Sequence, residues 1–424
     1  MRRFYTFFLY LLIPFLIIRL YWKGRRLPQY RRRISERFQL GAIEPSEVDV
    51  WIHAVSLGEV VAVTPVIDAF LEKKYRVMVT TMTPTGSEQV SKRFGQRVAH
   101  QYLPYDLPWA LRRFFKKINA RIGIIMETEL WPNVIFEANR RNLPLLLANA
   151  RLSDDAFKSY QKVRFFFKPI LQQFTEIMAQ SEEDARRYVA LGAPSQHMSV
   201  LGNLKFDLQI TISKDKNFPQ FKEKWGKERV VFIAASTHDN EEEQLLIRLT
   251  ELKQAIPSLL LLIAPRHPER FQTVYKLSKK LGFNTALRSQ FSTIDTHSDV
   301  IILDSLGELL GFYQLSDYAF VGGSLVPIGG HNLLEPIAMQ VPVFSGPYVS
   351  NAKAISRDLC VAEAIQLVKD ADELMQSICN MHAHQAIKER QVSNANAVLR
   401  ANRGSVARLM KKIEAILSHS DKSI

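Results

Sequence analysis

Acidic and basic side chains at the ends of apolar runs are the residues of this sequence that best suit acid–base chemistry and the binding of a charged ligand. Glu59 follows the apolar run 48–55, and Glu127 and Glu129 stand at the end of a second run. A carboxylate in the first turn of a helix can act as a general base, although the helix dipole tends to lower its pKa. Lys205 precedes a polar stretch and is placed to contact a charged ligand. Taken alone, each residue is also typical of a helix start or a solvated surface.

A second group of residues suits the binding of a phosphate. Pro265 and Arg266 directly follow an apolar run, and an arginine at a strand end before a proline-started helix is well placed to clamp a phosphate. Leu306, Gly307 and Glu308 open another predicted helix after a strand. We interpret both segments as ligand-contacting loops, although ordinary surface loops and helix starts share this composition.

The stretch 317–336, DYAFVGGSLVPIGGHNLLEP, is the most informative segment. A predicted strand ends at Val321, two glycine pairs follow, and a helix is predicted to start near Asn332. Glycines let backbone N–H groups approach a ligand closely, and a helix N-terminus favours an anion. The spacing matches neither the dinucleotide fingerprint nor the Walker loop, so it does not by itself indicate NAD or ATP. Glu335 is placed to accept hydrogen bonds from ribose hydroxyls, whereas two glycine pairs alone are also typical of turns.

Residues that could hold a metal ion show no suitable pattern. The ten histidines lack paired ligand spacing, and two cysteines cannot build a disulfide framework or a cysteine-based metal site. Asp370 and Asp372 have the DxD form, but their position before a late helix predicts an N-cap. The triplet 236–238, Ser-Thr-His, lacks the flanking glycines of a nucleophile elbow. We therefore expect neither a metal nor a cofactor.

Short apolar runs alternate with amphipathic stretches along the chain, which is the pattern of parallel βα units. The predicted strands of the first half are 48–55, 75–80, 123–127, 145–149 and 177–180, with helices such as 59–71 and 108–117 between them. Those of the second half are 230–235, 259–264, 300–303, 318–321 and 341–344, with helices such as 241–255, 268–281, 306–315 and 333–339. Two such series predict an α/β protein with two Rossmann-like, doubly wound domains that face a cleft.

The composition indicates a globular protein, and one polar stretch indicates where its two domains meet. Apolar residues are 47% and charged residues 23% of the chain, which excludes a disordered or fibrous protein. The polar, lysine-rich stretch 208–228 is predicted to be a linker between an N-terminal domain at 25–207 and a C-terminal domain at 229–424. The C-terminal domain ends in a charged helical tail at about 385–417, which we expect to pack across the domains.

The first 40 residues combine an apolar run with most of the positive charge. Residues 4–22 are apolar except for Thr6, Pro14 and Arg19, and as a helix they would be roughly 28 Å long, close to the thickness of a hydrocarbon core. Ten Lys or Arg and one acid give residues 1–40 a charge of +9 out of +14, so the excess is local and does not indicate a nucleic-acid-binding face. We predict that 1–24 is an uncleaved anchor among anionic inner-membrane lipids, with the body on the cytoplasmic side. A buried core helix is the alternative.

Taken together, several segments resemble the 3-deoxy-D-manno-octulosonic acid (Kdo) transferases of lipid A assembly. The resemblance spans nearly the whole chain and includes the apolar start with its basic flank. The segments that carry it are TTMTPTGSEQV at 80–90, YLPYDLP at 102–108, METELWPN at 126–133, NARLS at 149–153, LKFD at 204–207, STH at 236–238, PRHPERF at 265–271 and GGSLVPIGGHNLLEP at 322–336.

This resemblance implies a metal-independent, inverting glycosyltransferase with the two-domain GT-B fold. Such enzymes move Kdo from CMP-Kdo to the 6-hydroxyl of the outer glucosamine of the acylated lipid A precursor, in lipopolysaccharide biosynthesis. By the same resemblance Glu59 is the expected base, and Glu127 and Lys205 are the expected transition-state stabilisers. The implied CMP contacts are Pro265, Arg266, Leu306, Gly307, Glu308, Asn332, Leu333, Leu334 and Glu335. No protein partner is implied.

Two departures from the family pattern, and two rival functions, stay open at this point. Asp154 and Asp155 follow NARLS where many members carry an arginine, and Asn240 replaces a usual glycine after STH. A different GT-B enzyme, such as a UDP-sugar transferase or a sugar-nucleotide epimerase, would share the fold and the glycine loop. A non-enzymatic protein that binds membranes or nucleic acid through the basic segment is the other alternative.

Overall fold

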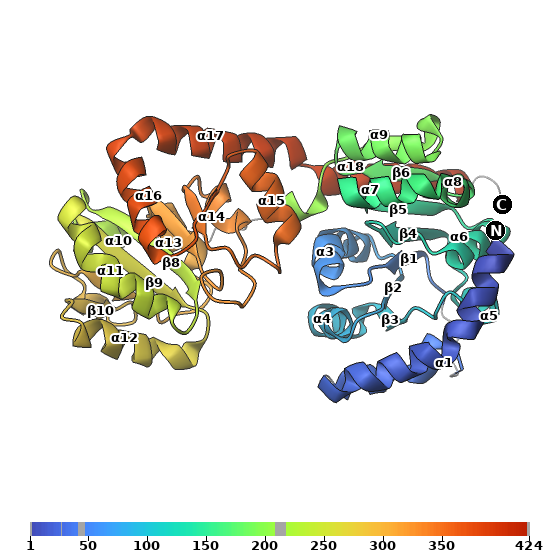
Figure 1. The fold of residues 1–424 in the computed structure, drawn as a ribbon, viewed down its shortest axis with the longest axis horizontal. Helices are drawn as coiled ribbons and strands as arrows, with labels where there is room; N and C mark the ends of the chain where they lie inside the picture. Colours follow the sequence, from blue (N-terminus) through green and yellow to red (C-terminus); the bar gives the residue numbers. More distant parts are fainter. Residues whose placement is uncertain (1, 27, 41–46, 208–217, 422–424) are drawn as a thin grey trace. The chain divides into compact units, whose positions relative to one another are not determined.

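The computed structural model describes residues 2–26, 28–40, 47–207 and 218–421. The chain forms two compact units, of which the first comprises Met1–Asp207 with Asn402–Ile424 and the second comprises Leu208–Ala401. Each unit is a parallel sheet with helices on both faces (Figure 1). The prediction of two Rossmann-like α/β domains is confirmed.

The first unit contains a seven-stranded parallel sheet in the order β3-β2-β1-β4-β5-β6-β7. Its strands are β1 Val50–His53, β2 Val77–Thr81, β3 Ala99–Tyr102, β4 Ile122–Met126, β5 Leu145–Ala150, β6 Glu176–Ala179 and β7 Met198–Val200. Its helices are α1 Arg2–Arg26, α2 Ile34–Arg37, α3 Leu57–Glu72, α4 Pro84–Phe94, α5 Pro108–Ile118, α6 Pro132–Arg140, α7 Asp154–Lys162, α8 Arg164–Leu171, α9 Glu182–Leu191 and α18 Ser405–Asp421. The order reverses between β1 and β4, and at such a switch point the carboxyl ends of the strands are open to a ligand.

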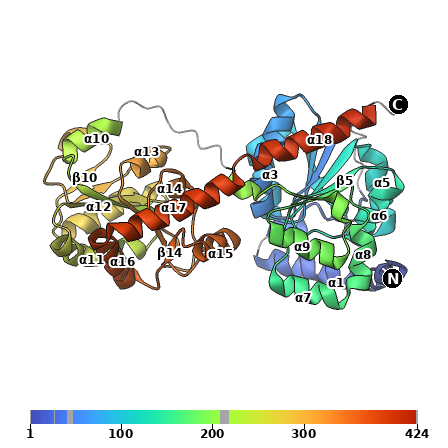
Figure 2. The same cartoon turned by 90° about the horizontal axis from the view of Figure 1, so that it is seen from above.

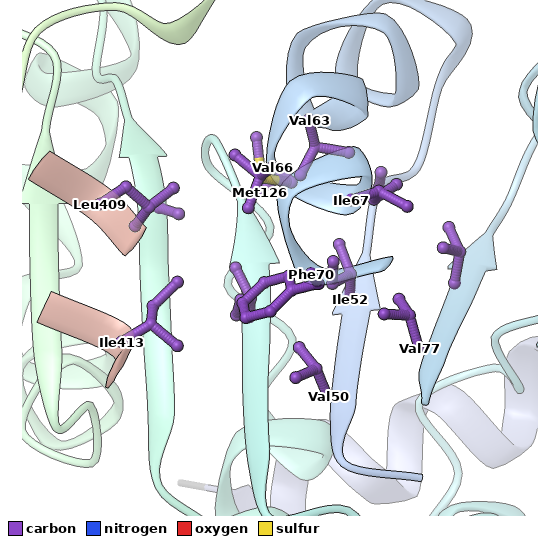
Figure 3. Packing of buried hydrophobic residues seen from close by; sticks show 14 of the residues in the cluster. Val50, Ile52, Val63, Val66, Ile67, Phe70, Val77, Met126, Leu409 and Ile413 are labelled. Atoms are coloured by element: carbon purple, nitrogen blue, oxygen red, sulfur yellow. The ribbon is translucent and has the colours of Figure 1, made fainter. Parts of the chain in front are cut away.

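Both faces of this sheet are covered by apolar side chains, which explains why its central strands read as continuous apolar runs. One face packs against α3, α4 and α18, and Figure 3 shows Leu409 and Ile413 of α18 in the same cluster as Phe70 of α3. The other face packs against α5, α6, α8 and α9. Thus α18, from the far end of the chain, completes the core of the first unit.

The second unit repeats this plan with the strand order β10-β11-β9-β8-β12-β13-β14. Its strands are β8 Val230–Thr237, β9 Leu259–Pro265, β10 Thr285–Leu287, β11 Val300–Ile302, β12 Tyr318–Val321, β13 Val343–Ser345 and β14 Gln366–Leu367. Its helices are α10 Phe218–Trp225, α11 Glu241–Ala255, α12 Phe271–Lys280, α13 Leu309–Gln314, α14 Leu334–Ala338, α15 Lys353–Val361, α16 Ala371–Ala383 and α17 Gln385–Asn402. Here the order reverses between β8 and β12, and the glycine-rich loop follows β12.

Two of the predicted boundaries differ from the structure. The predicted linker 208–228 contains α10, whose Phe218, Phe221 and Trp225 are buried in the core of the second unit, and its part 208–217 lies outside the described residues. The predicted C-terminal domain 229–424 includes α18, which belongs to the first unit because its apolar side chains are buried there. Figure 2 shows α17 leading into α18 as the chain returns to that unit.

Candidate functional site

At the start of α3, the side chain of Glu59 points back toward the residues that precede the helix. Ser56 caps the helix by accepting a hydrogen bond from Glu59 N at 3.4 Å, and its hydroxyl donates to Glu59 Oε1 at 2.8 Å. Val55 N donates to the other carboxylate oxygen, Oε2, at 2.8 Å. This arrangement resembles a capping box, which arises from Ser and Glu spaced three residues apart, but the carboxylate accepts from Val55 N, one residue before the N-cap. The carboxylate is therefore fixed at the carboxyl end of β1, with the residue only 6% exposed.

Burial changes the acidity of Glu59 in the direction opposite to the one expected from the helix dipole. Burial raises the pKa of Glu59 to about 7, the hydrogen bonds from Val55 and Ser56 oppose this shift, and the charges of Glu129 and Glu127 add to it. Loss of hydration is the largest of these effects, so the pKa is raised although a helix dipole tends to lower it. A carboxylate that titrates near neutral pH is suited to accept a proton from a sugar hydroxyl.

A carboxylate–ammonium pair lies at the neighbouring strand end. Lys205 Nζ donates to Glu127 Oε1 at 2.6 Å, which joins the loop after β4 to the short turn 204–206. Glu127 has a left-handed backbone conformation (φ 55°), and such strain in a residue with a side chain is common at functional sites. Burial raises the pKa of Glu129 as well, and Trp131 Nε1 donates to this carboxylate at 2.7 Å. Three acids and one lysine therefore gather at the carboxyl ends of β1 and β4.

In the second unit, five of the predicted nucleotide contacts line one pocket. They are Pro265, Arg266, Leu306, Gly307 and Glu308, and the pocket lies at the carboxyl ends of β8, β9 and β11. The backbone N–H of Arg266 donates to Thr237 O at 2.9 Å, so β8 positions this residue. Glu308 is held by Arg288 and by the Ser305 hydroxyl. The arginine side chain itself is exposed at the pocket and can meet an anion.

The other predicted contacts, Asn332 to Glu335, form a short turn of their own. Asn332 Oδ1 accepts from Leu334 N at 3.1 Å, and its amide donates to Glu335 Oε1 at 3.0 Å. The side chains of Leu333 and Leu334 are buried in the protein, so these two residues can offer only backbone atoms to a ligand. Burial raises the pKa of Glu335, and the charge of Arg266 opposes that shift, which places Glu335 within electrostatic range of the pocket arginine.

A buried carboxylate that the sequence did not single out organises the glycine-rich loop. Glu241, fully buried at the start of α11, accepts backbone hydrogen bonds at 2.7–3.0 Å from His238, Gly323, Ser324 and Leu325. Consecutive N–H groups of this kind form a concavity that commonly binds an anion. Here the protein supplies its own anion, so a phosphate must rely on other groups, such as Arg266. The sequence showed only an acid in the first turn of a helix, and three of its four partners lie more than 80 residues away.

Two histidines form a second feature missed by sequence reasoning. The Nε2 atoms of His238 and His331 are 2.8 Å apart, with the rings stacked, so one ring donates to the other. Burial, together with the charges of His238 and Arg266, lowers the pKa of His331 to about 4. Asn240, which replaces the usual glycine, adopts the left-handed conformation (φ 72°), which asparagine tolerates better than most residues with a side chain. Among the described residues, no group of three or more His, Cys, Asp or Glu is arranged to hold a metal ion.

Comparisons with known proteins identify the family to which this chain belongs. Residues 32–208 match the family described as 3-deoxy-D-manno-octulosonic-acid transferase (kdotransferase). The 3-deoxy-D-manno-octulosonic acid transferase of Haemophilus influenzae is 38% identical to the chain over 99% of both sequences. The chain belongs to the Kdo transferase family. It is therefore a glycosyltransferase of lipopolysaccharide biosynthesis.

Further similarities support the family and the fold of this Kdo transferase. The enzyme of the same name from Bordetella pertussis is 32% identical, over 97% of the chain and 99% of its own length. A glycosyltransferase structure from Rickettsia africae is 13% identical and superimposes with a TM-score of 0.50, covering 88% of the chain and 99% of its own. The GT-B fold expected from the sequence is confirmed.

Proposed function

We propose that this Kdo transferase moves Kdo from CMP-Kdo to the 6-hydroxyl of the outer glucosamine of the acylated lipid A precursor, with inversion at the anomeric carbon. The observation that carries the proposal is the buried Glu59, whose pKa of about 7 suits a base that works at neutral pH. Inversion requires one displacement, in which the hydroxyl oxygen attacks from the face opposite the leaving CMP. Glu59 takes the hydroxyl proton as the new C–O bond forms and the bond to the CMP phosphate breaks.

The remaining charged groups have complementary roles in this reaction. The leaving CMP changes from a phosphate diester to a monoester, so negative charge grows on it, and Arg266 is the exposed pocket cation that would compensate that charge. Lys205 suits the carboxylate of Kdo itself, and Glu127 suits the positive charge that develops at the anomeric carbon. We propose that no metal takes part, because Arg266 offers the charge that a divalent cation would otherwise supply.

A transfer assay with defined donors and acceptors tests this function. The full-length enzyme is incubated with CMP-Kdo and the acylated precursor, and mass spectrometry measures the added Kdo while NMR assigns the linkage. We expect transfer from CMP-Kdo but not from UDP-sugars, and none to an acceptor that lacks the 6-hydroxyl. Transfer from a UDP-sugar, or undiminished transfer to the deoxy acceptor, would contradict the proposal. Arg266→Ala should cost about 2–4 kcal/mol of transition-state stabilisation, and Arg266→Lys should restore only part of it.

We further propose that the enzyme is held at the bacterial inner membrane by residues 1–24, with both units on the cytoplasmic side. Over Arg2–Arg25, α1 is long and apolar enough to cross a membrane, and residues 1–40 carry a charge of +9. Deletion of residues 1–24 should release the protein from membranes washed at high salt, because salt screens an attachment that is only electrostatic. Quantitative pelleting of the truncated protein under these conditions would argue against this anchor.

A further inference from the structure

One face of α1 is packed against the first unit along most of the helix. Leu9, Ile13 and Ile17 pack with Phe38, Leu107 and Ala110, which belong to the segment after α2 and to the start of α5. These three helix positions are four residues apart, and side chains at that spacing lie on one face of a helix. The α1 helix is therefore a structural part of the first unit over its central turns.

The packing continues at both ends of the helix. Near the N-terminus, Asn133 Nδ2 donates to Thr6 Oγ1 at 3.0 Å, and the guanidinium of Arg2 lies 4.7 Å from the ring centre of Phe136. Both partners are on α6. Near the C-terminal end, Leu20 is only 5% exposed. The contacts from residue 2 to residue 20 correspond to roughly 27 Å of helix, nearly the thickness of a hydrocarbon core.

The opposite face of α1 is a continuous apolar stripe. Its members are 46–65% exposed and are spaced alternately by four and three residues, which places them along one line of the helix. They are Phe4, Phe8, Leu11, Phe15, Ile18 and Trp22. Lys23 and the exposed Arg3 and Arg25 flank this exposed stripe at its two ends. Basic residues beside an apolar stripe, with a tryptophan at its end, match the surface of an anionic bilayer in both charge and depth.

We propose that α1 lies in the plane of an anionic membrane leaflet, with the first unit along one side and the exposed stripe inserted among the lipids. A helix that crossed the bilayer in this docked position would draw the α5 and α6 segments that it contacts into hydrocarbon, together with Arg113, whose guanidinium lies 5.8 Å from the ring centre of Trp109 in this contact region. Detachment of α1 from the unit would instead expose the contacts of Leu9 and Ile13 and break the Thr6 hydrogen bond. Pro14 lies inside the continuous helix α1, where proline removes a backbone hydrogen bond and favours a kink, and Figure 1 shows a bent helix.

The proposal rests on the membrane association proposed above but not on the donor or the acceptor. It is tested by determining on which side of the membrane each end of α1 lies. Cys360 and Cys379 are replaced by serine in the full chain, and single cysteines are introduced as Arg3→Cys or Arg25→Cys. Intact spheroplasts and inverted membrane vesicles are treated with a membrane-impermeant maleimide, and labelling after detergent addition gives the total. A helix in the leaflet plane predicts that both positions react only in inverted vesicles. Reaction of Arg3→Cys from the periplasmic side, with Arg25→Cys reacting from the other, would overturn it.

A second measurement identifies what covers the exposed stripe. The full chain is mixed with vesicles that contain phosphatidylglycerol, and the fraction that floats with them is measured. Phe15→Glu should reduce this fraction roughly tenfold, because a charge replaces an inserted ring. Val361→Glu, at an 81% exposed position on α15, is the matched control and should leave flotation unchanged. Equal effects of the two variants, or a stripe that forms a dimer without lipid and is unaffected by vesicles, would overturn the proposal. If wild type does not float at all, the membrane association itself fails, whereas the transfer assay is unaffected.

Discussion

At the scale of single residues, the buried position of Glu59 sets the expected pH dependence of the enzyme. A base must be unprotonated to act, so kcat/KM should rise with pH and level off above about 7, the raised pKa of this carboxyl. Glu59→Gln should lower turnover roughly 10²–10⁴-fold and remove this limb, while CMP binding stays near normal. Glu129→Gln is the informative companion: it removes a charge that raises the pKa of Glu59, so the limb should move to lower pH. An unchanged profile in Glu59→Gln would assign the base elsewhere.

The same raised pKa makes a prediction for stability. Because the pKa of Glu59 is higher in the folded protein than in the unfolded chain, its contribution to stability is complete below the unfolded value near 4.5 and is lost as pH rises through about 7. The free energy of unfolding of the wild type should therefore fall, relative to that of Glu59→Gln, as pH increases across this window. Denaturant unfolding of both proteins at several pH values measures the difference. A difference that is constant with pH, or that grows toward alkaline pH, would contradict the raised pKa.

The ion pair between Lys205 and Glu127 gives a separate test of cooperation. Their side chains are 2.6 Å apart, and residues that act as a unit show non-additive effects on rate. Lys205→Met and Glu127→Gln should each lower turnover at least tenfold, and the double variant should lose much less than the product of the two. A double-mutant cycle on kcat measures this coupling. Independent, multiplicative losses would mean that the two residues do not work together.

At the scale of elements, the apolar runs predicted the central strands and failed at the edges. All ten predicted strands occur, and no boundary is shifted by more than two residues: β12 matches its prediction at both ends, and β1 is shorter than predicted by two residues at each end. The unpredicted strands are β3, β7, β10 and β14, which occupy the four sheet edges and have only two to four residues. An edge strand is paired on one side only and needs fewer buried side chains, so its sequence carries a weaker pattern.

The sequence predicted the position of a candidate site residue where that position depends only on neighbouring residues in the chain. The strand-to-helix position of Glu59 and the strand-end position of Arg266 follow from the pattern of runs, and the structure places them there. The resemblance to the family, and not the pattern, paired Glu127 with Lys205 in one role. Glu241 was missed because three of its four partners are distant in the sequence, and the raised pKa of Glu59 could not be predicted because burial is a property of the folded chain.

The loop after β12 depends on one carboxylate, which gives a prediction for stability at this scale. Glu241→Ala would leave four N–H groups without their acceptor in a buried site, and unsatisfied buried groups cost about 1–3 kcal/mol each. We expect a loss of several kcal/mol in the free energy of unfolding and weaker CMP binding. Glu243→Gln changes an exposed acid in the same helical turn and should alter stability by about 0.5 kcal/mol or less. Denaturant unfolding of the two variants compares them directly, and similar values would contradict the role of Glu241.

At the scale of the whole molecule, the last helix is tied to the segment that carries Lys205. The carboxylate of Asp207 accepts from Gly404 N at 3.0 Å and from Val406 N at 2.8 Å, at the start of α18. The Asn402 side chain in turn accepts from Asn203 N at 2.7 Å. The C-terminal helix therefore fixes the turn that holds the lysine against Glu127.

This connection predicts an effect on activity from a residue that need not touch the substrate. Asp207→Ala should lower stability by about 1 kcal/mol through loss of the helix cap and should also reduce kcat, because Lys205 is less well held. Asp370→Ala removes the corresponding cap of α16 in the second unit and should cost similar stability with little change in kcat. Denaturant unfolding and the transfer assay, applied to both variants, separate the two effects. Equal losses of kcat would show that α18 has no special link to the site.

The return of the chain through α17 and α18 also determines the order in which the parts of the first unit are synthesised on the ribosome. The first unit lacks Leu409 and Ile413 until the last helix has been made, and roughly 200 residues of the second unit are translated in between. At about 5–20 residues per second, the wait is roughly 10–40 s. During that interval an unfinished apolar surface is exposed in the nascent chain, while α1 has already emerged. Early binding of α1 to the membrane would keep neighbouring nascent chains apart. The core of the first unit would then be completed only when α18 packs onto the sheet.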